Sequence, residues 1–167
     1  MATVKFVVHD HKARRAGYHQ DLRFQDPKNM KNWYSFAVPK KVPLNPGEKV
    51  LAIQTHVHTE EEALFQGEIP PKEYGGGIIT VFDQGVCRIE KLTSAHIVIQ
   101  FQGAKIKGLY HMVSLGNVKK SKFKQKQYLL FKSKMTDYQP LKIKGSSLDT
   151  ILKTGSRFRM YPGGRIA

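Results

Sequence analysis

Hydrophobic and polar residues alternate along most of this 167-residue chain. Val4, Phe6 and Val8 define one apolar face of the first such segment. Similar runs follow at residues 34–38, 50–58, 76–82, 85–92, 95–101, 108–115 and 127–134. A period of two is typical of β-strands that bury one face and expose the other. The pattern therefore predicts an all-β fold of about eight short strands.

Turn-forming sequences separate these segments. They are DPKN at 26–29, PLNPGE at 43–48, YGGG at 74–77 and DQG at 83–85. One segment has helical character, SSLDTILK at 146–153, with a serine cap and an aspartate in its first turn. Short strands joined by tight turns favour a closed β-barrel or a β-sandwich. No linker divides the chain, so we expect a single domain over residues 1–167.

The positive charge is concentrated in the last third of the chain. The net charge is +15, and residues 104–167 carry 15 Lys and Arg against two acidic residues. Such a field attracts polyanions. Aromatic residues interleave with the lysines, which favours nucleic acid over a merely solvated cationic face; the four aromatics are Tyr110, Phe123, Tyr128 and Phe131. The lysines expected to bind it are Lys119, Lys120, Lys122, Lys124 and Lys126.

The compartment is expected to be the cytoplasm, without a membrane partner. No apolar run approaches the roughly 20 residues that span a bilayer. The first eight residues are too short and too soon interrupted by charge for a signal peptide. A single cysteine, Cys87, excludes internal disulfides and suits a reducing environment.

Histidines and a carboxylate recur in pairs that share a strand face. His9 and His11 are two residues apart, as are His19 and Asp21, and as are two further histidines at 56 and 58. A lone histidine is usually an ordinary surface or core residue, but several such pairs on different strands favour a metal site. Two imidazoles and one carboxylate commonly bind Mn, Fe or Zn.

Arg23 lies two residues beyond Asp21, on the same predicted strand face. A guanidinium beside a divalent cation is unfavourable unless an anion lies between them. Phosphate suits that position because it accepts a bidentate contact from arginine and binds metal through oxygen. The residues alone therefore indicate a metal-assisted phosphate site.

A competing hypothesis starts from HVHTEEE. The spacing His56-x-His58-x3-Glu62, followed by Gly67, approximates the first metal motif of cupins. The second cupin motif is missing downstream, so a cupin-like metal enzyme is the weaker alternative.

Three blocks of sequence resemble the 3′-phosphoesterase domain of bacterial DNA ligase D and its stand-alone archaeal relatives. The blocks are HDHKARR…YHQDLRF, WYSFAVPKKVPLNPGEKVLAIQTHVH and FQGEIPPKEYGGGIITVFDQG, within residues 6–134. The family pattern runs K-H-D-A-R-R-L-H-Y-D-x-R-L, W-A-V-P-K-G-P, D-H-P and F-E-G-x-I-P-x-G-x-Y-G-x-G. The resemblance implies a compact β-barrel, closed or partly closed, with one or two short helices, and leaves residues 135–167 as a basic C-terminal extension.

The resemblance also implies an activity and its cofactor. Members trim DNA 3′ ends for repair, first removing a terminal ribonucleoside and then the remaining 3′-phosphate, so that a 3′-hydroxyl is left for ligation. Carried over by motif, His11, His19 and Asp21 would bind the metal. Manganese is the usual ion, and Zn²⁺ or Co²⁺ would suit the same ligands.

The resemblance assigns three further residues to catalysis. Arg23 matches the phosphate-binding arginine, His58 matches the histidine of D-H-P, and Lys40 matches the lysine of A-V-P-K that lines the groove. A non-catalytic barrel that only binds nucleic-acid ends is the alternative from another functional class. We expect a monomer that acts on DNA or RNA-tipped DNA ends, alone or beside a separate DNA ligase.

Two departures from the family pattern bear on the site. The residues AGY at 16–18 replace a single family residue, an even insertion that should preserve the facing of His19 and Asp21. Glu62 replaces a family tyrosine and is expected to face solvent. The chain also begins close to the first strand, without the N-terminal arm that some relatives use for ribonucleoside removal. Phosphate removal is therefore the firmer of the two expected activities.

Overall fold

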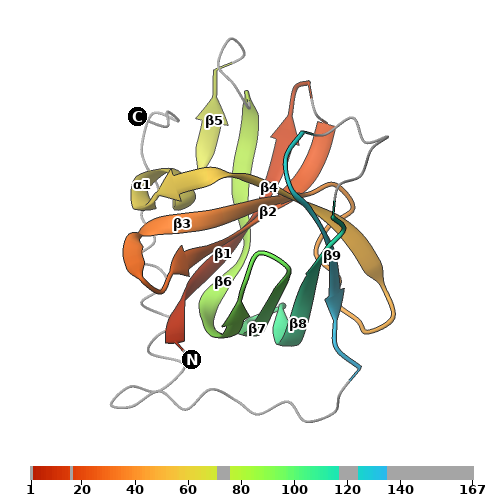
Figure 1. The fold of residues 1–167 in the computed structure, drawn as a ribbon. Coiled ribbons are helices and arrows are strands. Elements are labelled where there is room, and N and C mark those ends of the chain that lie inside the picture. The colour runs from red at the N-terminus through yellow and green to blue at the C-terminus, as the bar shows by residue number, and fades with distance from the viewer. Residues whose placement is uncertain (1, 16, 71–75, 117–123, 135–167) are drawn as a thin grey trace.

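Antiparallel pairing between successive strands builds the fold (Figure 1). The computed structural model describes residues 2–15, 17–70, 76–116 and 124–134. The strands are β1 (Ala2–Ala13), β2 (Gly17–Asp26), β3 (Asn29–Val38), β4 (Lys49–Thr59), β5 (Gly67–Ile69), β6 (Gly77–Leu92), β7 (His96–Gly103), β8 (Lys107–Ser114) and β9 (Gln127–Lys132). The helix is α1 (Glu60–Ala63). The extension at 135–167, including the helix expected at 146–153, lies outside the described residues.

The sheet closes on itself. Its strand order is β1-β2-β3-β4-β9-β8-β7-β6-β5, and β1 also pairs with β6. Eight strands thereby form a closed antiparallel barrel, while β5 pairs with β6 outside the ring. The predicted all-β barrel is confirmed, and the sandwich alternative is wrong because the β1–β6 pairing closes the sheet into a ring. Among the described residues, no helix is long and apolar enough to cross a membrane.

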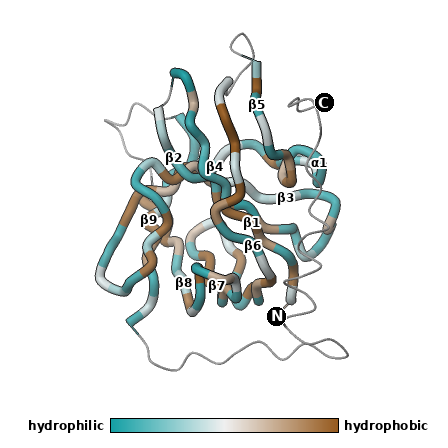
Figure 2. The backbone as a smooth tube through the Cα atoms, turned by 180° about the vertical axis from the view of Figure 1, so that it is seen from behind, coloured by the Kyte–Doolittle hydropathy of each residue, from teal (hydrophilic) through white to brown (hydrophobic). Residues whose placement is uncertain are grey.

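Alternate residues of the strands fill the barrel. On β1 and β2 the inward residues include Phe6, Val8, Leu22 and Phe24, which belong to the main hydrophobic core. Figure 2 shows hydrophobic and hydrophilic segments interleaved along the strands, as the period of two requires. The remaining residues of β1 and β2 therefore point to the outer face of the barrel wall.

The turn predicted at residues 83–85 is wrong. β6 runs without a break through these residues. The Asp83 carboxylate instead accepts hydrogen bonds from the backbone N–H groups of Ala104, Lys105 and Ile106, and so anchors the neighbouring β7–β8 turn. Gly103 lies against this carboxylate, where a Cβ atom would come within 2.2 Å of Asp83 Oδ2. Asp83 therefore holds the turn between β7 and β8 and does not form a turn itself.

A smaller apolar cluster covers part of the outer face. Val7 and Trp33 on the barrel wall pack against Ala63 and Leu64, which belong to or follow α1. The helix begins at Thr59, whose hydroxyl accepts a hydrogen bond from the Glu62 N–H, while the Glu62 carboxylate accepts from the Thr59 N–H. This capping box fixes α1 against the wall. Val7 pairs with Arg23 and Trp33 pairs with His58, so this cluster adjoins polar residues of the same outer face.

Candidate metal and phosphate site

The β1–β2 hairpin brings the predicted metal ligands together on the outer face of the barrel. His11 pairs directly with His19 across the two strands, and His9 pairs with Asp21. Gly17, with φ of +74°, closes the hairpin loop and pairs with Ala13. Gly17 and Tyr18 of the AGY run belong to β2 and pair with β1, so the insertion lengthens the hairpin, and His19 and Asp21 face the same side as predicted.

The carboxylate of Asp21 lies between the two imidazoles. Its Oδ2 atom is 3.3 Å from His11 Nδ1, and its Oδ1 atom is 3.3 Å from His19 Nε2. Burial alone would raise the pKa of this carboxyl, but the Arg23 charge and the two histidines hold the pKa well below its usual range. Asp21 is therefore an anion in the folded protein, as a metal ligand must be.

The three side chains fit a divalent transition-metal ion. One donor atom from each of His11, His19 and Asp21 lies within 4.8 Å of the other two. Burial opposes protonation of His19, yet the hydrogen bond and charge of Asp21 outweigh it and raise the pKa of His19. A cation bound at the carboxylate would take over this stabilisation, because metal ions and protons compete for the same nitrogen.

Arg23 is buried next to Asp21 and is held by three neighbours. Its Nη2 atom is 3.6 Å from Asp21 Oδ2, its Nε donates to Ser35 Oγ at 3.0 Å, and its Nη1 donates to His9 Nδ1 at 2.9 Å. Burial lowers the pKa of Arg23, and Asp21 opposes that change. The guanidinium remains charged because the ordinary pKa of arginine lies far above neutral pH. It is a fixed cation beside the candidate metal ligands.

His9 is a member of the site whose role the sequence did not reveal. The residue is fully buried, and burial together with the Arg23 charge lowers the pKa of His9 to about 3. Because a guanidinium only donates, His9 Nδ1 accepts and its proton resides on Nε2. That Nε2 atom has no hydrogen-bond partner among the described residues. His9 is thus a neutral support that orients Arg23.

His58 reaches the same face through a β-bulge in β4. Trp33 pairs with His58, whereas Ser35 pairs with Thr55, so β4 carries one extra residue between the two pairs. Burial, with the Arg23 charge next in size, lowers the pKa of His58 to about 4. His58 is therefore neutral at pH 7 and lies within the electrostatic reach of Arg23.

Glu62 differs from its expected place in solvent. Its carboxylate caps α1 and is half-buried, with Oε2 3.8 Å from His56 Nε2. The T-x-x-E spacing at 59–62 is a capping signal that was legible in the sequence. Ser35, which fixes Arg23, carries no comparable signal because a single serine in a strand has many uses.

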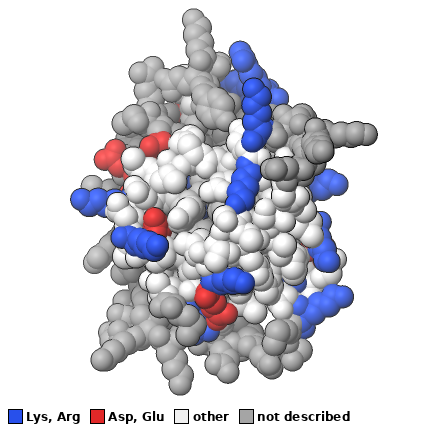
Figure 3. Space-filling view, in the orientation of Figure 1, with Lys and Arg blue, Asp and Glu red and all other residues white. Residues whose placement is uncertain are grey.

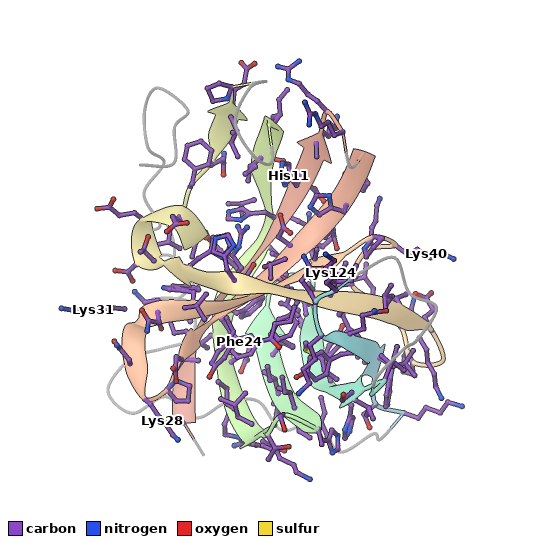
Figure 4. The ribbon with its side chains drawn as sticks, turned by 45° about the horizontal axis from the view of Figure 1, so that its top comes forward. His11, Phe24, Lys28, Lys31, Lys40 and Lys124 are labelled. Carbon is purple, nitrogen blue, oxygen red and sulfur yellow. The ribbon has the colours of Figure 1, made fainter. Side chains whose placement is uncertain are left out.

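Among the described residues, the predicted lysines are not part of this cluster. Lys40 lies in the turn after β3, and Figure 4 shows its side chain extending away from the body of the protein, unlike His11. Lys124 and Lys126 are exposed, whereas Lys119, Lys120 and Lys122 lie outside the described residues. On the face shown in Figure 3, the described Lys and Arg side chains are scattered and separated by uncharged surface.

Two of the interleaved aromatic residues cannot stack on nucleic-acid bases. Tyr110 and Tyr128 are buried in the main core, and their hydroxyls donate to the carbonyls of Pro43 and Ser94. Phe131 is partly buried, its ring stacked on that of His111, and Phe123 lies outside the described residues. The argument from aromatic interleaving is therefore wrong for Tyr110 and Tyr128, because strand alternation turns these two side chains into the barrel.

Comparison with known proteins places the chain in a family. A family model described as the DNA ligase D 3′-phosphoesterase domain matches residues 9–114. The match is shorter than the resemblance at 6–134, but it spans every predicted metal and catalytic residue. The chain belongs to the DNA ligase D 3′-phosphoesterase domain family. This membership replaces the cupin hypothesis.

Relatives in this family are much longer proteins. The multifunctional non-homologous end joining protein LigD of Mycobacterium bovis is 35% identical over 112 residues, covering 65% of this chain and 14% of the relative. Its namesake in Mycolicibacterium smegmatis is 34% identical over 120 residues, covering 65% and 15%. That of Pseudomonas aeruginosa is 32% identical over 136 residues, covering 78% and 15%. The chain thus spans about one seventh of the length of these relatives.

Proposed function

We propose that this chain is a metal-dependent phosphoesterase that removes 3′-phosphate, and a 3′-terminal ribonucleoside, from DNA primer strands to leave a ligatable 3′-hydroxyl during break repair. The observation that carries the proposal is the contact of Arg23 with Asp21, itself flanked by His11 and His19. A metal-ligand set beside a buried, fixed guanidinium suits an anion that binds both. Membership of the 3′-phosphoesterase domain family supports a 3′-phosphate ester as the substrate.

The proposed cofactor is a divalent metal ion held by His11, His19 and Asp21. Mn²⁺ is the first choice, and Zn²⁺ or Co²⁺ suits the same two nitrogens and one carboxylate. When bound, such an ion polarises a phosphate oxygen and lowers the pKa of a water ligand.

The protein's own side chains would bind and orient the phosphate. Arg23 would donate hydrogen bonds to two phosphoryl oxygens and oppose the charge that develops on them. Its fixed orientation, set by Ser35 and His9, lowers the reorganisation needed during reaction. His58 Nδ1 donates to the His56 carbonyl oxygen, so His58 would take up a proton on Nε2 when the phosphate binds and donate from that nitrogen to a phosphoryl oxygen. Lys40 would contact the nucleic acid farther from the reacting group.

The remaining partners follow from charge and family. Nine of the 15 Lys and Arg in residues 104–167 lie outside the described residues, and we propose that this region, with Lys124 and Lys126, holds the DNA backbone. We further propose that the protein acts as a monomer in the cytoplasm, with a DNA ligase to seal the ends it prepares. These assignments are independent of the metal site.

The test is a primer–template whose primer ends in a 3′-phosphate, incubated with protein and either Mn²⁺ or a chelator. We expect Mn²⁺-dependent conversion to a 3′-hydroxyl end, and a second primer ending in one ribonucleotide to be shortened. His19→Ala should abolish both conversions while retaining binding to the primer–template. Tyr18→Phe is the matched control, because Tyr18 adjoins His19 but its hydroxyl contacts Asp10 instead.

The same experiment addresses the non-catalytic alternative. A protein that binds the 3′-phosphorylated primer with or without Mn²⁺, and never releases phosphate, would be an end-binding barrel and would refute the proposed activity.

A further inference from the structure

A second group of potential metal ligands lies where β4 leads into α1. One donor atom each from His56, His58 and Glu62 lies within 4.8 Å of the other two. The two imidazole rings are stacked, with centroids 4.1 Å apart and planes 19° from parallel. His56 Nε2 is 3.8 Å from Glu62 Oε2. None of these contacts involves the ligand set on the β1–β2 hairpin.

The hydrogen bonds already present leave one donor atom of each residue available. Glu62 Oε1 accepts from the backbone N–H and the hydroxyl of Thr59, so Oε2 is the oxygen turned towards His56. His58 Nδ1 donates to the His56 carbonyl oxygen at 2.8 Å, which fixes the tautomer and leaves Nε2 as the basic nitrogen. A backbone carbonyl that orients an imidazole in this way is a common support in metal sites.

Exposure gives this group the open side that ion entry requires. The His56 side chain is 62% exposed, whereas that of Glu62 is 24% exposed. Zinc–ligand bonds are about 2.0–2.2 Å long, so the three donors would have to approach one another, and one of the two stacked rings would have to turn so that both nitrogens point at the ion. The solvent-exposed His56 ring can make that movement without disturbing the barrel. Glu60 and Glu61 in the same turn add negative charge nearby.

We propose that His56, His58 and Glu62 form a second divalent-metal site, separate from the one at His11, His19 and Asp21. Two imidazoles and one carboxylate with an open side favour Zn²⁺ over oxygen-preferring ions such as Mg²⁺. The proposal concerns binding alone. An ion here would occupy His58 Nε2, the nitrogen proposed above to contact the phosphate, so Zn²⁺ and phosphate would exclude each other at His58.

The test measures bound Zn²⁺ per chain by equilibrium dialysis and elemental analysis, with the full chain and its variants. His56→Asn and Glu62→Gln should each bind one Zn²⁺ fewer than the unmodified chain, or bind it at least about tenfold more weakly. Gln at position 62 keeps the capping box but removes the carboxylate. His19→Ala should lose the ion of the first site and keep the ion of the second.

Thr59→Ala is the matched control. It removes the cap of α1 but leaves all three donors, so it should bind as much Zn²⁺ as the unmodified chain. Unchanged Zn²⁺ binding in both His56→Asn and Glu62→Gln would overturn the proposal. Equal loss in Thr59→Ala and Glu62→Gln would also overturn it, because Glu62 would then act only through the helix.

Discussion

The two faces of the β1–β2 hairpin are both buried, but by different means. The inner face presents Phe6 and Phe24 to the hydrocarbon core of the barrel. The outer face presents Asp21 and Arg23, which are 4% and 6% exposed, respectively. Burial by itself therefore does not distinguish the core from the candidate site.

What differs is how each face compensates for leaving water. Inner side chains gain from the removal of apolar surface, roughly 25 cal/mol per Å². Outer side chains lose their interactions with water. Contacts of Asp21 with two histidines and Arg23 replace those interactions. Such networks add little net stability. We therefore attribute the polar outer face to the proposed metal and phosphate binding, and the following changes test that contrast from the largest effect to the smallest.

Phe24→Ala should separate stability from metal binding. Removing a buried phenyl ring typically lowers the free energy of unfolding by about 3–5 kcal/mol. Urea denaturation should show that loss, while Mn²⁺ affinity of the still-folded fraction remains that of the unmodified chain. A variant that lost Mn²⁺ binding in proportion to stability would show that the two faces are not independent.

Arg23→Lys should lower activity, in contrast to Phe24→Ala, which should lower stability. Lysine keeps the charge but cannot make bidentate contacts with phosphate. Loss of one well-placed donor typically costs about 10²–10³-fold in rate. We expect kcat on the 3′-phosphorylated primer to fall by that factor, with retained Mn²⁺ binding. Activity within a factor of three of the unmodified chain would remove Arg23 from the reaction.

His9→Gln should change how stability depends on pH. Because the pKa of His9 falls from 6.5 to about 3 on folding, the unfolded chain binds a proton between these values and the folded chain does not. Stability is therefore lost as pH falls below 6.5, by up to about 1.4 kcal/mol per pH unit from this residue. Burial shifts the pKa of His58 in the same direction, whereas the pKa of His19 is raised and opposes it.

The measurement compares urea denaturation of His9→Gln and the unmodified chain at pH 7, 6 and 5 with chelator present. Glutamine can still accept the Arg23 hydrogen bond but does not titrate, so the stability difference between the two proteins should narrow with acidification. His56→Asn, at an exposed histidine, is the control. Parallel pH profiles for His9→Gln and the unmodified chain would contradict the buried, neutral His9.

Lys124→Gln with Lys126→Gln should have the smallest effect, since neither side chain belongs to either face. Each phosphate contact contributes a slope of about −0.9 in log K against log salt for duplex DNA. The double variant should lower that slope in magnitude by at most about two in a fluorescence anisotropy titration. An unchanged slope would assign DNA binding to other residues.

The period of two predicted most of this architecture. Strand alternation placed His19, Asp21 and Arg23 on one face, and their contacts agree with that placement. The wrong predictions concern residues whose position or role depends on a contact with a neighbouring strand. The Asp83 run was misread as a turn because its function is to hold the β7–β8 turn across the sheet. The position of His58 depends on a bulge, which no local pattern reveals.

The role of His9 was beyond prediction for a related reason. Its facing followed from the sequence, but its contact with Arg23 depends on the side-chain conformations of two strands. The His9–His11 spacing predicted only metal ligands. It gave no indication that His9 would instead accept a hydrogen bond from Arg23. The functional roles of Lys40 and of the lysines at 119–126 stay predictions.

The most direct test of the account is a crystal structure of the protein with Mn²⁺ and a 3′-phosphorylated oligonucleotide, measured at a wavelength that gives an anomalous signal from manganese. We expect an anomalous peak bound by His11, His19 and Asp21, with the terminal phosphate between that peak and Arg23. A phosphate bound away from Arg23, or no manganese at these three side chains, would contradict the central claim that the polar outer face of the hairpin is the reaction site.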